Sequence, residues 1–263
     1  MKLHFRQYSD SGMPLLILHG LFGNLKNWNW HARELARDFR LYALDLRNHG
    51  ESPHSAAMDY PIMANDVLEF IAGEELEEVG ILGHSMGGKV AMQLALDNPQ
   101  CISRLLVVDI APTSYGAERG DHEDVFGGLL SIDLSSLRSR TEAESLLASR
   151  VEERAVRQFL VSNLVRDEHS NYRWRFNLPA LYNNYGRLRE GVSGPQVFEK
   201  PVLFVKGDLS NYLMGEDRSM IRQLFPAANI TTMMGAGHWL HAEKPEVFYR
   251  LARDFFAGEE TES

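Results

Sequence analysis

Six short apolar runs, in which polar and apolar residues do not alternate, constrain most strongly how this 263-residue chain can fold. Runs of this length are too short for helices and suit strands that are buried on both faces, as in a parallel sheet. Segments with helical periodicity separate the runs, and such alternation of strands and helices predicts a doubly wound α/β sheet. The runs cover residues 15–19, 41–45, 79–83, 105–109, 201–205 and 230–234, and the helical patterns cover about 28–38, 61–73, 86–98, 217–225 and 245–257.

One long interval, between Asp109 and Val202, breaks this alternation. It contains no convincing strand, and helical patterns fill it around residues 121–131, 139–166 and 178–189. We therefore expect residues 112–199 to form a helical cap, inserted into a core that consists of residues 1–111 and 200–263. The cap is rich in arginine. Most of these arginines are expected on solvated helix faces, with a few available to an anionic substrate group, because guanidinium binds phosphate in a bidentate manner.

Composition and charge exclude several other classes of protein. The formal net charge of −9 argues against a nucleic-acid binder, which needs a basic face for phosphates. The single cysteine, Cys101, cannot form an internal disulfide and disfavours a structural zinc site. The N-terminal residues lack the apolar core of a signal peptide, and no stretch approaches the length of a membrane span. The expectation is a soluble, cytoplasmic globular protein, and its oligomeric state stays open.

The segment Gly83-His84-Ser85-Met86-Gly87 joins a predicted strand to a predicted helix, which is the setting that a G-x-S-x-G turn requires. Small residues at 83 and 87 let the backbone turn sharply, which would hold Ser85 exposed above the sheet as a candidate nucleophile. The N–H of Met86 then lies at a helix N-terminus, where it can donate to a developing oxyanion. A glycine-rich turn with a chance serine is the weaker alternative, since both flanking elements are present.

A serine hydroxyl needs a base to become a nucleophile, and His238 is the candidate among ten histidines. It lies in a glycine-flanked loop after the last predicted strand, at the edge where an open α/β sheet gathers its site. The nearest rival is His241, which we expect to cap or brace the helix that begins near Pro245.

A second oxyanion donor is expected in the loop after the first apolar run, His19-Gly20-Leu21-Phe22-Gly23. Its glycines let the backbone approach the site, so the Leu21 N–H is the candidate, and His19 is expected to be structural. The segment from Asp45 to Ser52 forms a third loop at the same end of the sheet. We expect it to brace its neighbours through local hydrogen bonds, without a catalytic role for His49.

Taken together and in this order, these motifs make the chain resemble the α/β-hydrolase family from His19 to His238. The H-G-x-x-G loop, the D-x-R-x-H-G-x-S loop, the G-x-S-x-G turn and the late A-G-H carry the likeness. A closer similarity is to the bacterial esterase/acyl-CoA thioesterase branch, which has mitochondrial abhydrolase relatives. The resemblance implies the α/β-hydrolase fold, a mostly parallel sheet with flanking helices and a helical cap, and a carboxylic-ester or thioester hydrolase. The further segments that carry it are Asp109-Ile110-Ala111-Pro112, Trp174-Arg175-Phe176-Asn177 and His238–Pro245.

The acid of the expected triad is where the sequence departs from the common family pattern. In most members the acid follows the penultimate strand, three residues past a glycine, and that position is Ser210 here. Asp208 lies only one residue past Gly207, whereas Asp109 ends the preceding strand at the same edge of the sheet. Either aspartate keeps the chain order Ser, Asp, His. We prefer Asp109, with capping of the turn that follows it as the alternative role.

The resulting hypothesis is hydrolysis of a small-molecule ester or thioester, such as an acyl-CoA, through an acyl-enzyme. Ser85 attacks, His238 acts as general base, Asp109 orients the histidine, and the N–H groups of Leu21 and Met86 hold the oxyanion. No metal or organic cofactor is needed. Phe22 and Trp239 are expected to line the acyl pocket, with ordinary core packing as the alternative. The rival functions are a carbon–carbon bond hydrolase with the same triad and a non-catalytic, hydrolase-like binding protein.

Overall fold

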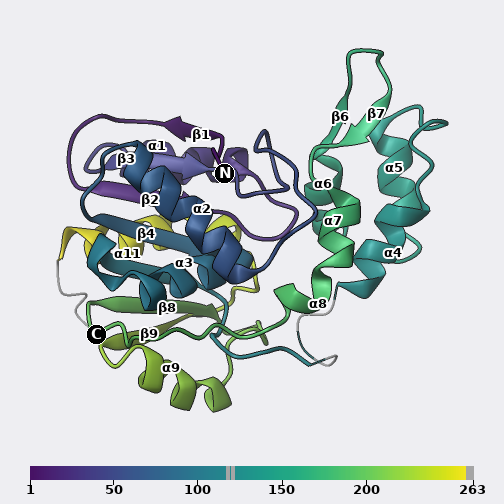
Figure 1. Cartoon of the computed structure of the whole chain (residues 1–263). Coiled ribbons are helices and arrows are strands. Elements are labelled where there is room, and N and C mark those ends of the chain that lie inside the picture. Colours follow the sequence, from purple (N-terminus) through teal and green to yellow (C-terminus); the bar gives the residue numbers. More distant parts are fainter. Residues whose placement is uncertain (117–118, 120–121, 259–263) are drawn as a thin grey trace.

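The computed structural model describes residues 1–116, 119 and 122–258, and these residues form a seven-stranded sheet of order β1-β3-β2-β4-β5-β8-β9 (Figure 1). Each of the six apolar runs corresponds to a strand, and neighbouring strands among the six are parallel. The predicted α/β sheet is therefore confirmed. The strands are β2 (Pro14–Leu18), β3 (Arg40–Leu44), β4 (Val79–His84), β5 (Ile102–Val108), β8 (Val202–Gly207) and β9 (Ala228–Met233).

A seventh strand, β1 (Phe5–Gln7), pairs antiparallel with β3 at one edge of the sheet. The apolar-run pattern does not predict it, because this strand has three residues and only Phe5 is apolar. Edge strands are solvated along one side and need no continuous apolar run.

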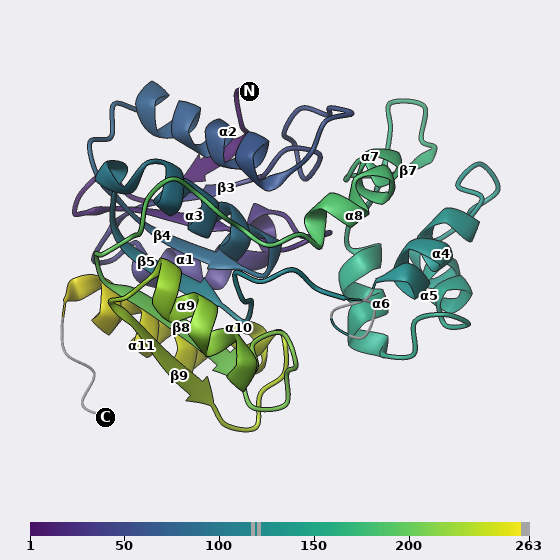
Figure 2. The same ribbon diagram turned by 60° about the horizontal axis from the view of Figure 1, so that its bottom comes forward.

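Helices cover both faces of the sheet, because successive side chains of a strand point to opposite faces (Figures 1 and 2). Leu16 and Leu18 of β2 belong to one hydrophobic cluster, and Leu15 and Ile17 belong to the other. The first cluster is covered by α2 (Tyr60–Gly73), α3 (Met86–Asp97) and α9 (Arg218–Leu224), and the second by α1 (Asn29–Leu35) and α11 (Pro245–Ala257).

The segment between β5 and β8 lies beyond the carboxyl ends of the strands, to the right of the sheet in Figure 1. Most of its regular elements are helices, and residue 121 of the expected helix 121–131 lies outside the described residues. Its elements are α4 (Glu123–Ser131), α5 (Arg140–Leu147), α6 (Arg154–Val161), β6 (Leu164–Arg166), β7 (Tyr172–Trp174), α7 (Leu178–Asn183) and α8 (Tyr185–Leu188). Nowhere in the described part of the chain is a helix both long and apolar enough to span a membrane.

The expectation of helix across 139–166 is wrong in two places. Residues 148–153 are not helical and separate α5 from α6, and at the end of the range β6 pairs antiparallel with β7. The cause of this pairing is the turn between the two strands. One carboxylate oxygen of Asp167 accepts hydrogen bonds from the backbone N–H groups of His169 (2.9 Å) and Asn171 (2.8 Å). Ser170 takes a φ of 67°, and together these features reverse the chain.

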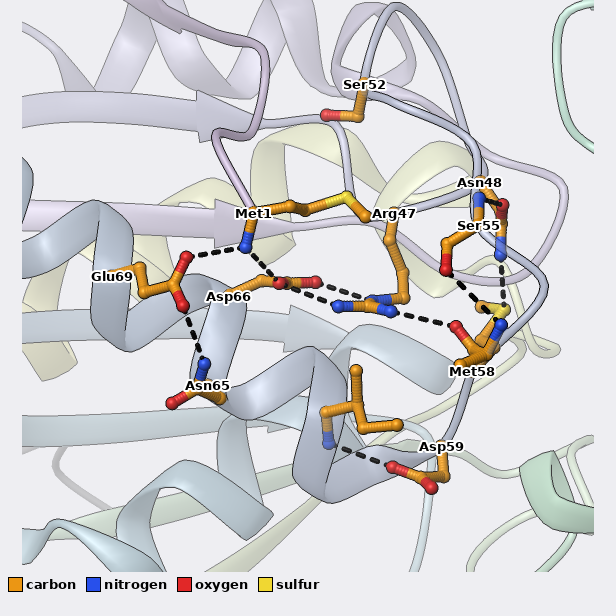
Figure 3. A network of polar contacts seen from close by, with 12 residues as sticks. Met1, Arg47, Asn48, Ser52, Ser55, Met58, Asp59, Asn65, Asp66 and Glu69 are labelled. Atoms are coloured by element: carbon orange, nitrogen blue, oxygen red, sulfur yellow. Dashed lines mark hydrogen bonds and ion pairs between the residues drawn. The ribbon is translucent and has the colours of Figure 1, made fainter.

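A buried ion pair fastens the loop after β3 to α2 (Figure 3). The Arg47 guanidinium donates to both carboxylate oxygens of Asp66, at 2.6 and 2.8 Å, and also to the Ala57 carbonyl at 2.8 Å. The N-terminal ammonium of Met1 adds contacts to Asp66 (2.6 Å) and Glu69 (2.5 Å). A bidentate pair of this kind fixes geometry as well as adding energy. The ion pair therefore attaches the loop that begins at Asp45 to helix α2.

Candidate active site

Ser85 lies in the turn that connects β4 to α3, and its backbone is strained, with φ 51° and ψ −120°. The turn needs glycine on either side of the serine. A Cβ on Gly83 would lie 2.4 Å from the Gly87 carbonyl oxygen, and a Cβ on Gly87 would lie 2.5 Å from the Leu18 carbonyl oxygen. Only 8% of Ser85 is exposed to solvent, less than the sequence suggests, because the side chain faces cavities below the helical segment.

His238 lies after β9, and its Nδ1 donates a hydrogen bond to Oδ2 of Asp109 at 2.7 Å. Asp109 follows β5 with a φ of 49° and is completely buried. Its carboxylate also accepts from the Gly207 N–H (3.0 Å, to Oδ1) and from the Ser210 hydroxyl (to Oδ2). With the proton on Nδ1, the neutral imidazole leaves a lone pair on Nε2.

The other candidate acid, Asp208, has a different partner. Its Oδ1 accepts a hydrogen bond from the backbone N–H of Ala236 at 3.0 Å, which ties the loop after β8 to the loop that carries His238. Ser210, at the position where the family pattern expects the acid, instead donates its hydroxyl to Asp109. Of the two aspartates, Asp109 is thus the one in contact with His238.

Three residues for which the sequence predicts no role in the site surround His238. The Tyr212 ring stacks on the imidazole, with centroids 3.9 Å apart, and Ser210 shares the Asp109 oxygen that His238 uses. His84 donates from Nε2 to the His238 carbonyl at 3.0 Å. Burial lowers the pKa of His84 well below its usual value, so this side chain is neutral. Because His84 directly precedes Ser85 in the G-x-S-x-G motif, its position in the sequence could have indicated that it lies in the site.

His241 packs within α10 (Leu240–Glu243) instead of contacting Asp109. Its ring stacks on Trp28, with centroids 4.2 Å apart and planes 8° from parallel, and it lies 6.1 Å from the ring of Phe248 in α11. Burial lowers the pKa of His241 well below its usual value. These contacts agree with the expectation that His241 braces the helix that begins at Pro245.

The loop of the candidate oxyanion donor Leu21 is held by two buried histidines. His19 Nε2 accepts from the Leu46 N–H at 3.0 Å, and His49 Nε2 accepts from the Phe22 N–H at 3.2 Å. Burial lowers the pKa of His19 and lowers that of His49 to about 3. Both are therefore neutral acceptors, and the expected bracing between the two loops is present. Leu21 and Met86 both border a cavity with Ser85.

Asn163 links the helical segment to this same loop. Its amide nitrogen donates to the Phe22 carbonyl at 2.8 Å, and its amide oxygen accepts from the Asn24 side chain at 2.8 Å. The residue is completely buried. A polar side chain is retained in such surroundings only when its hydrogen bonds are made, so Asn163 fixes the loop relative to the insertion.

Ser85 lines two cavities of very different size, about 820 Å³ and about 30 Å³. Phe22 and Trp239, which the sequence predicts to line an acyl pocket, lie on the larger one. Of the described residues around the larger cavity, none is lysine or arginine, whereas Glu153 and Glu243 are acidic. The expectation that arginines of residues 112–199 meet an anionic group is thus not met there. No group of three or more His, Cys, Asp or Glu within the described ranges could hold a metal ion.

Comparison with known proteins identifies the family of this chain. Esterase YbfF of Escherichia coli K12 is 34% identical over 259 residues, which cover 97% of this chain and 99% of that protein. The sn-1-specific diacylglycerol lipase ABHD11 of Xenopus laevis is 37% identical, over 97% of this chain and 84% of that protein. The solved structure of a marine microorganism esterase has a TM-score of 0.94 and 41% identity, covering 97% and 99% of the two chains. The family model of the alpha/beta hydrolase fold matches residues 13–245, and this chain belongs to that family.

Proposed function

We propose that this protein hydrolyses carboxylic esters or thioesters through an acyl-enzyme formed on Ser85. The observation that carries the proposal is the 2.7 Å contact between His238 Nδ1 and Asp109 Oδ2 at a cavity that Ser85 also lines. A histidine held by a carboxylate beside a serine on a strained turn is the arrangement that activates a serine hydroxyl. The similarity to proteins named as esterases and as a lipase favours esters as the class of substrate.

In the proposed reaction, Ser85 Oγ attacks the carbonyl carbon while His238 Nε2 takes the hydroxyl proton. The N–H groups of Leu21 and Met86 donate to the oxyanion that develops. When the C–O or C–S bond breaks, His238 returns the proton to the leaving alcohol or thiol. A water molecule, deprotonated by the same histidine, then cleaves the acyl-enzyme to the free acid and restores Ser85.

Asp109 acts in this scheme through His238. Its carboxylate holds the proton on Nδ1, which keeps Nε2 available as the base, and it stabilises the imidazolium that forms during attack. The hydrogen bonds from Gly207 and Ser210 fix the orientation of the carboxylate. A carboxylate that is held by three donors loses little freedom when the histidine becomes charged.

The insertion, residues 112–199, is assigned the role of a cap over the site. Val125 and Phe159 of this segment line the larger cavity together with Phe22 and Trp239 of the core. The Phe159 and Trp239 rings lie 5.9 Å apart between centroids, which closes an apolar wall across the two parts. Phe22 and Trp239 are therefore proposed to contact the substrate.

A carbon–carbon bond hydrolase with the same three residues is the second candidate, and a non-catalytic binding protein is the third. Both would have the same Ser85, Asp109 and His238 geometry. A vinylogous diketone tests the second candidate, because its carbon–carbon bond is cleaved only by an enzyme that can expel a carbon leaving group. Absence of turnover with esters, thioesters and the diketone would favour the third.

Stopped-flow mixing of the enzyme with p-nitrophenyl acetate tests the proposal directly. We expect a burst of p-nitrophenol equal to the concentration of active sites, since acylation releases the alcohol before water releases the acid. Ser85→Ala removes the burst and the steady-state turnover while leaving the circular dichroism spectrum unchanged. Turnover of that variant close to the wild-type rate would mean that another residue is the nucleophile.

A further inference from the structure

The two cavities that meet at Ser85 differ in volume by more than twentyfold, at about 820 and about 30 Å³. A space of 30 Å³ holds one or two water molecules, which corresponds to a methyl or ethyl group. The larger space accepts a group the size of a fused aromatic ring or a lipid-like alcohol. A substrate whose carbonyl carbon lies at Ser85 therefore has one small and one large substituent.

The position of His238 indicates which substituent enters which cavity. His238 lines the larger cavity with Trp239 and Gly237, and it is not among the residues around the smaller one. The proposed mechanism requires Nε2 to protonate the leaving oxygen or sulfur, so the leaving group extends on the side of this histidine. The acyl substituent then occupies the smaller cavity.

Buried hydrogen bonds hold the walls of the smaller cavity in place. The Tyr60 hydroxyl donates to the Leu188 carbonyl at 2.6 Å. The Tyr115 hydroxyl donates to the Tyr212 carbonyl at 2.6 Å and accepts from the Ala111 N–H at 2.8 Å. Expansion of the cavity would break these hydrogen bonds, and a buried polar group that is left without its partner costs about 1–3 kcal/mol. These hydrogen bonds therefore oppose a widening of the cavity to fit longer acyl chains.

The charge around the larger cavity restricts the leaving group. Glu153 and Glu243 lie on it, and the described residues that line it include neither lysine nor arginine. Arg189 borders the smaller cavity instead, where it donates to the carbonyls of Tyr115 and Gly116. A leaving group that carries phosphates would meet carboxylates without a compensating cation.

We propose that the substrates are short-acyl esters, acetyl or propionyl, of bulky alcohols that are uncharged or cationic, and that Leu188 and Tyr60 set the limit on acyl length. This inference rests on the proposed function, because it uses His238 as the acid that protonates the leaving group. It separates the substrates of this protein from long-chain acyl esters and from acyl-CoA.

The acyl limit is tested with 1-naphthyl esters that differ only in the acid, from acetate through propionate and butyrate to octanoate. We expect kcat/KM to fall at least tenfold from acetate to butyrate, since a methylene group that does not fit costs about 10- to 200-fold. Leu188→Ala should raise the butyrate-to-acetate ratio at least tenfold. Ile110→Val, a milder enlargement of the same cavity, should raise it in the same direction if Leu188→Ala does not fold.

Val125→Ala is the matched control, because Val125 lines only the larger cavity. It should leave the butyrate-to-acetate ratio within twofold of the wild type. Octanoate turnover equal to acetate turnover in the wild type, or an unchanged ratio in both Leu188→Ala and Ile110→Val, would overturn the acyl assignment. If no naphthyl ester is cleaved, acetate included, the proposed function fails and not this inference alone.

The leaving-group preference is tested with two acetyl thioesters of alkyl thiols, acetylthiocholine and acetyl-CoA. At low ionic strength, we expect kcat/KM to be at least tenfold higher for acetylthiocholine than for acetyl-CoA. Glu153→Gln should reduce this difference in kcat/KM between the two thioesters. Equal kcat/KM for the two thioesters, or a preference for acetyl-CoA, would overturn this part of the proposal. Added salt should also narrow the difference, because it screens the carboxylates.

Discussion

His238 Nδ1 lies 2.7 Å from Asp109 Oδ2, although the two residues follow β9 and β5, which β8 separates in the sheet. The carboxylate crosses the end of β8, where the N–H of Gly207, the last residue of that strand, donates to its other oxygen at 3.0 Å. The carboxylate that contacts His238 thus comes from a central strand and is held in place by the end of the neighbouring strand β8.

Asp109→Asn should lower kcat by roughly two to four powers of ten, with little change in KM. The amide keeps the shape of the side chain but favours the wrong histidine tautomer and leaves the imidazolium unpaired. In a serine protease that serves as the reference case for such triads, the same change costs about 10⁴ in kcat. Steady-state kinetics with p-nitrophenyl acetate measure the effect.

Asp208→Asn is the matched control for that variant. Its carboxylate accepts from the Ala236 N–H, and an amide oxygen can accept the same hydrogen bond. We expect kcat within about tenfold of the wild type. A dead Asp208→Asn together with an active Asp109→Asn would reverse the assignment, and loss of activity only in the double variant would mean that the two carboxylates share the role.

His238→Ala should abolish esterase activity without unfolding the protein, whereas His241→Ala should mainly lower stability. The His241 ring is buried against Trp28, so its removal leaves a cavity, and we expect a loss of about 1–3 kcal/mol in the free energy of unfolding. Turnover and urea unfolding are measured for both variants. An inactive but stable His241→Ala beside an active His238→Ala would show that the base is misassigned.

The free energy of unfolding should fall as the pH drops below about 6.5. Burial lowers the pKa of His31 to about 4 and that of His49 to about 3, so the folded protein keeps both neutral where the unfolded chain binds protons. The contribution of each histidine to the free energy of unfolding is fully present above pH 6.5. It is lost progressively as the pH falls toward the pKa of that histidine in the folded protein. Each contributes up to about 1.4 kcal/mol per pH unit.

Urea unfolding at pH 7.5, 6.0 and 5.0 measures this dependence, with His31→Leu as the comparison. His31 is buried beside Trp28 and Phe248, where leucine fits the apolar surroundings. Between pH 6 and 5, the free energy of unfolding should fall less steeply with pH in His31→Leu than in the wild type, by about 1 kcal/mol per pH unit. Identical slopes in the two proteins would show that His31 does not contribute to the acid sensitivity.

Asp66→Ala should lower the free energy of unfolding by about 3–5 kcal/mol, because it leaves the buried Arg47 guanidinium unpaired. Glu69→Gln is the control, since Glu69 also contacts the Met1 ammonium but its side chain is 54% exposed. That variant should stay within about 0.5 kcal/mol of the wild type. Thermal and urea unfolding of both variants measure the effect. Equal losses of unfolding free energy in Asp66→Ala and Glu69→Gln would contradict the importance of the buried ion pair.

The central sheet could be predicted from the sequence because its strands are buried on both faces and therefore read as uninterrupted apolar runs. The antiparallel β1 and the β6–β7 hairpin could not be found in this way, since each of these strands has three residues and a polar, partly exposed face. The Asp, Ser and Asn residues of the Asp167 turn are typical of turns. The helical periodicity that precedes them nevertheless favours a continued helix over a hairpin.

Ser85 and His238 are marked by local motifs, and Asp109 by its place at the end of a strand. Tyr212 and Asn163 carry no such signal, because their contacts join segments more than 25 and more than 130 residues apart in the chain. The division of the site into a large and a small cavity is likewise a matter of packing between the insertion and the core, which no spacing in the sequence records.

The location of His238 at one edge of the sheet has a consequence for how the candidate site responds to heat. Ser85 and Asp109 follow the adjacent central strands β4 and β5, whereas His238 follows β9, which in the described part of the chain pairs only with β8. An edge strand exchanges its amide protons through local opening that requires less free energy than global unfolding. We therefore expect thermal inactivation to precede the melting of the central sheet, with opening of the C-terminal edge as the step that ends activity.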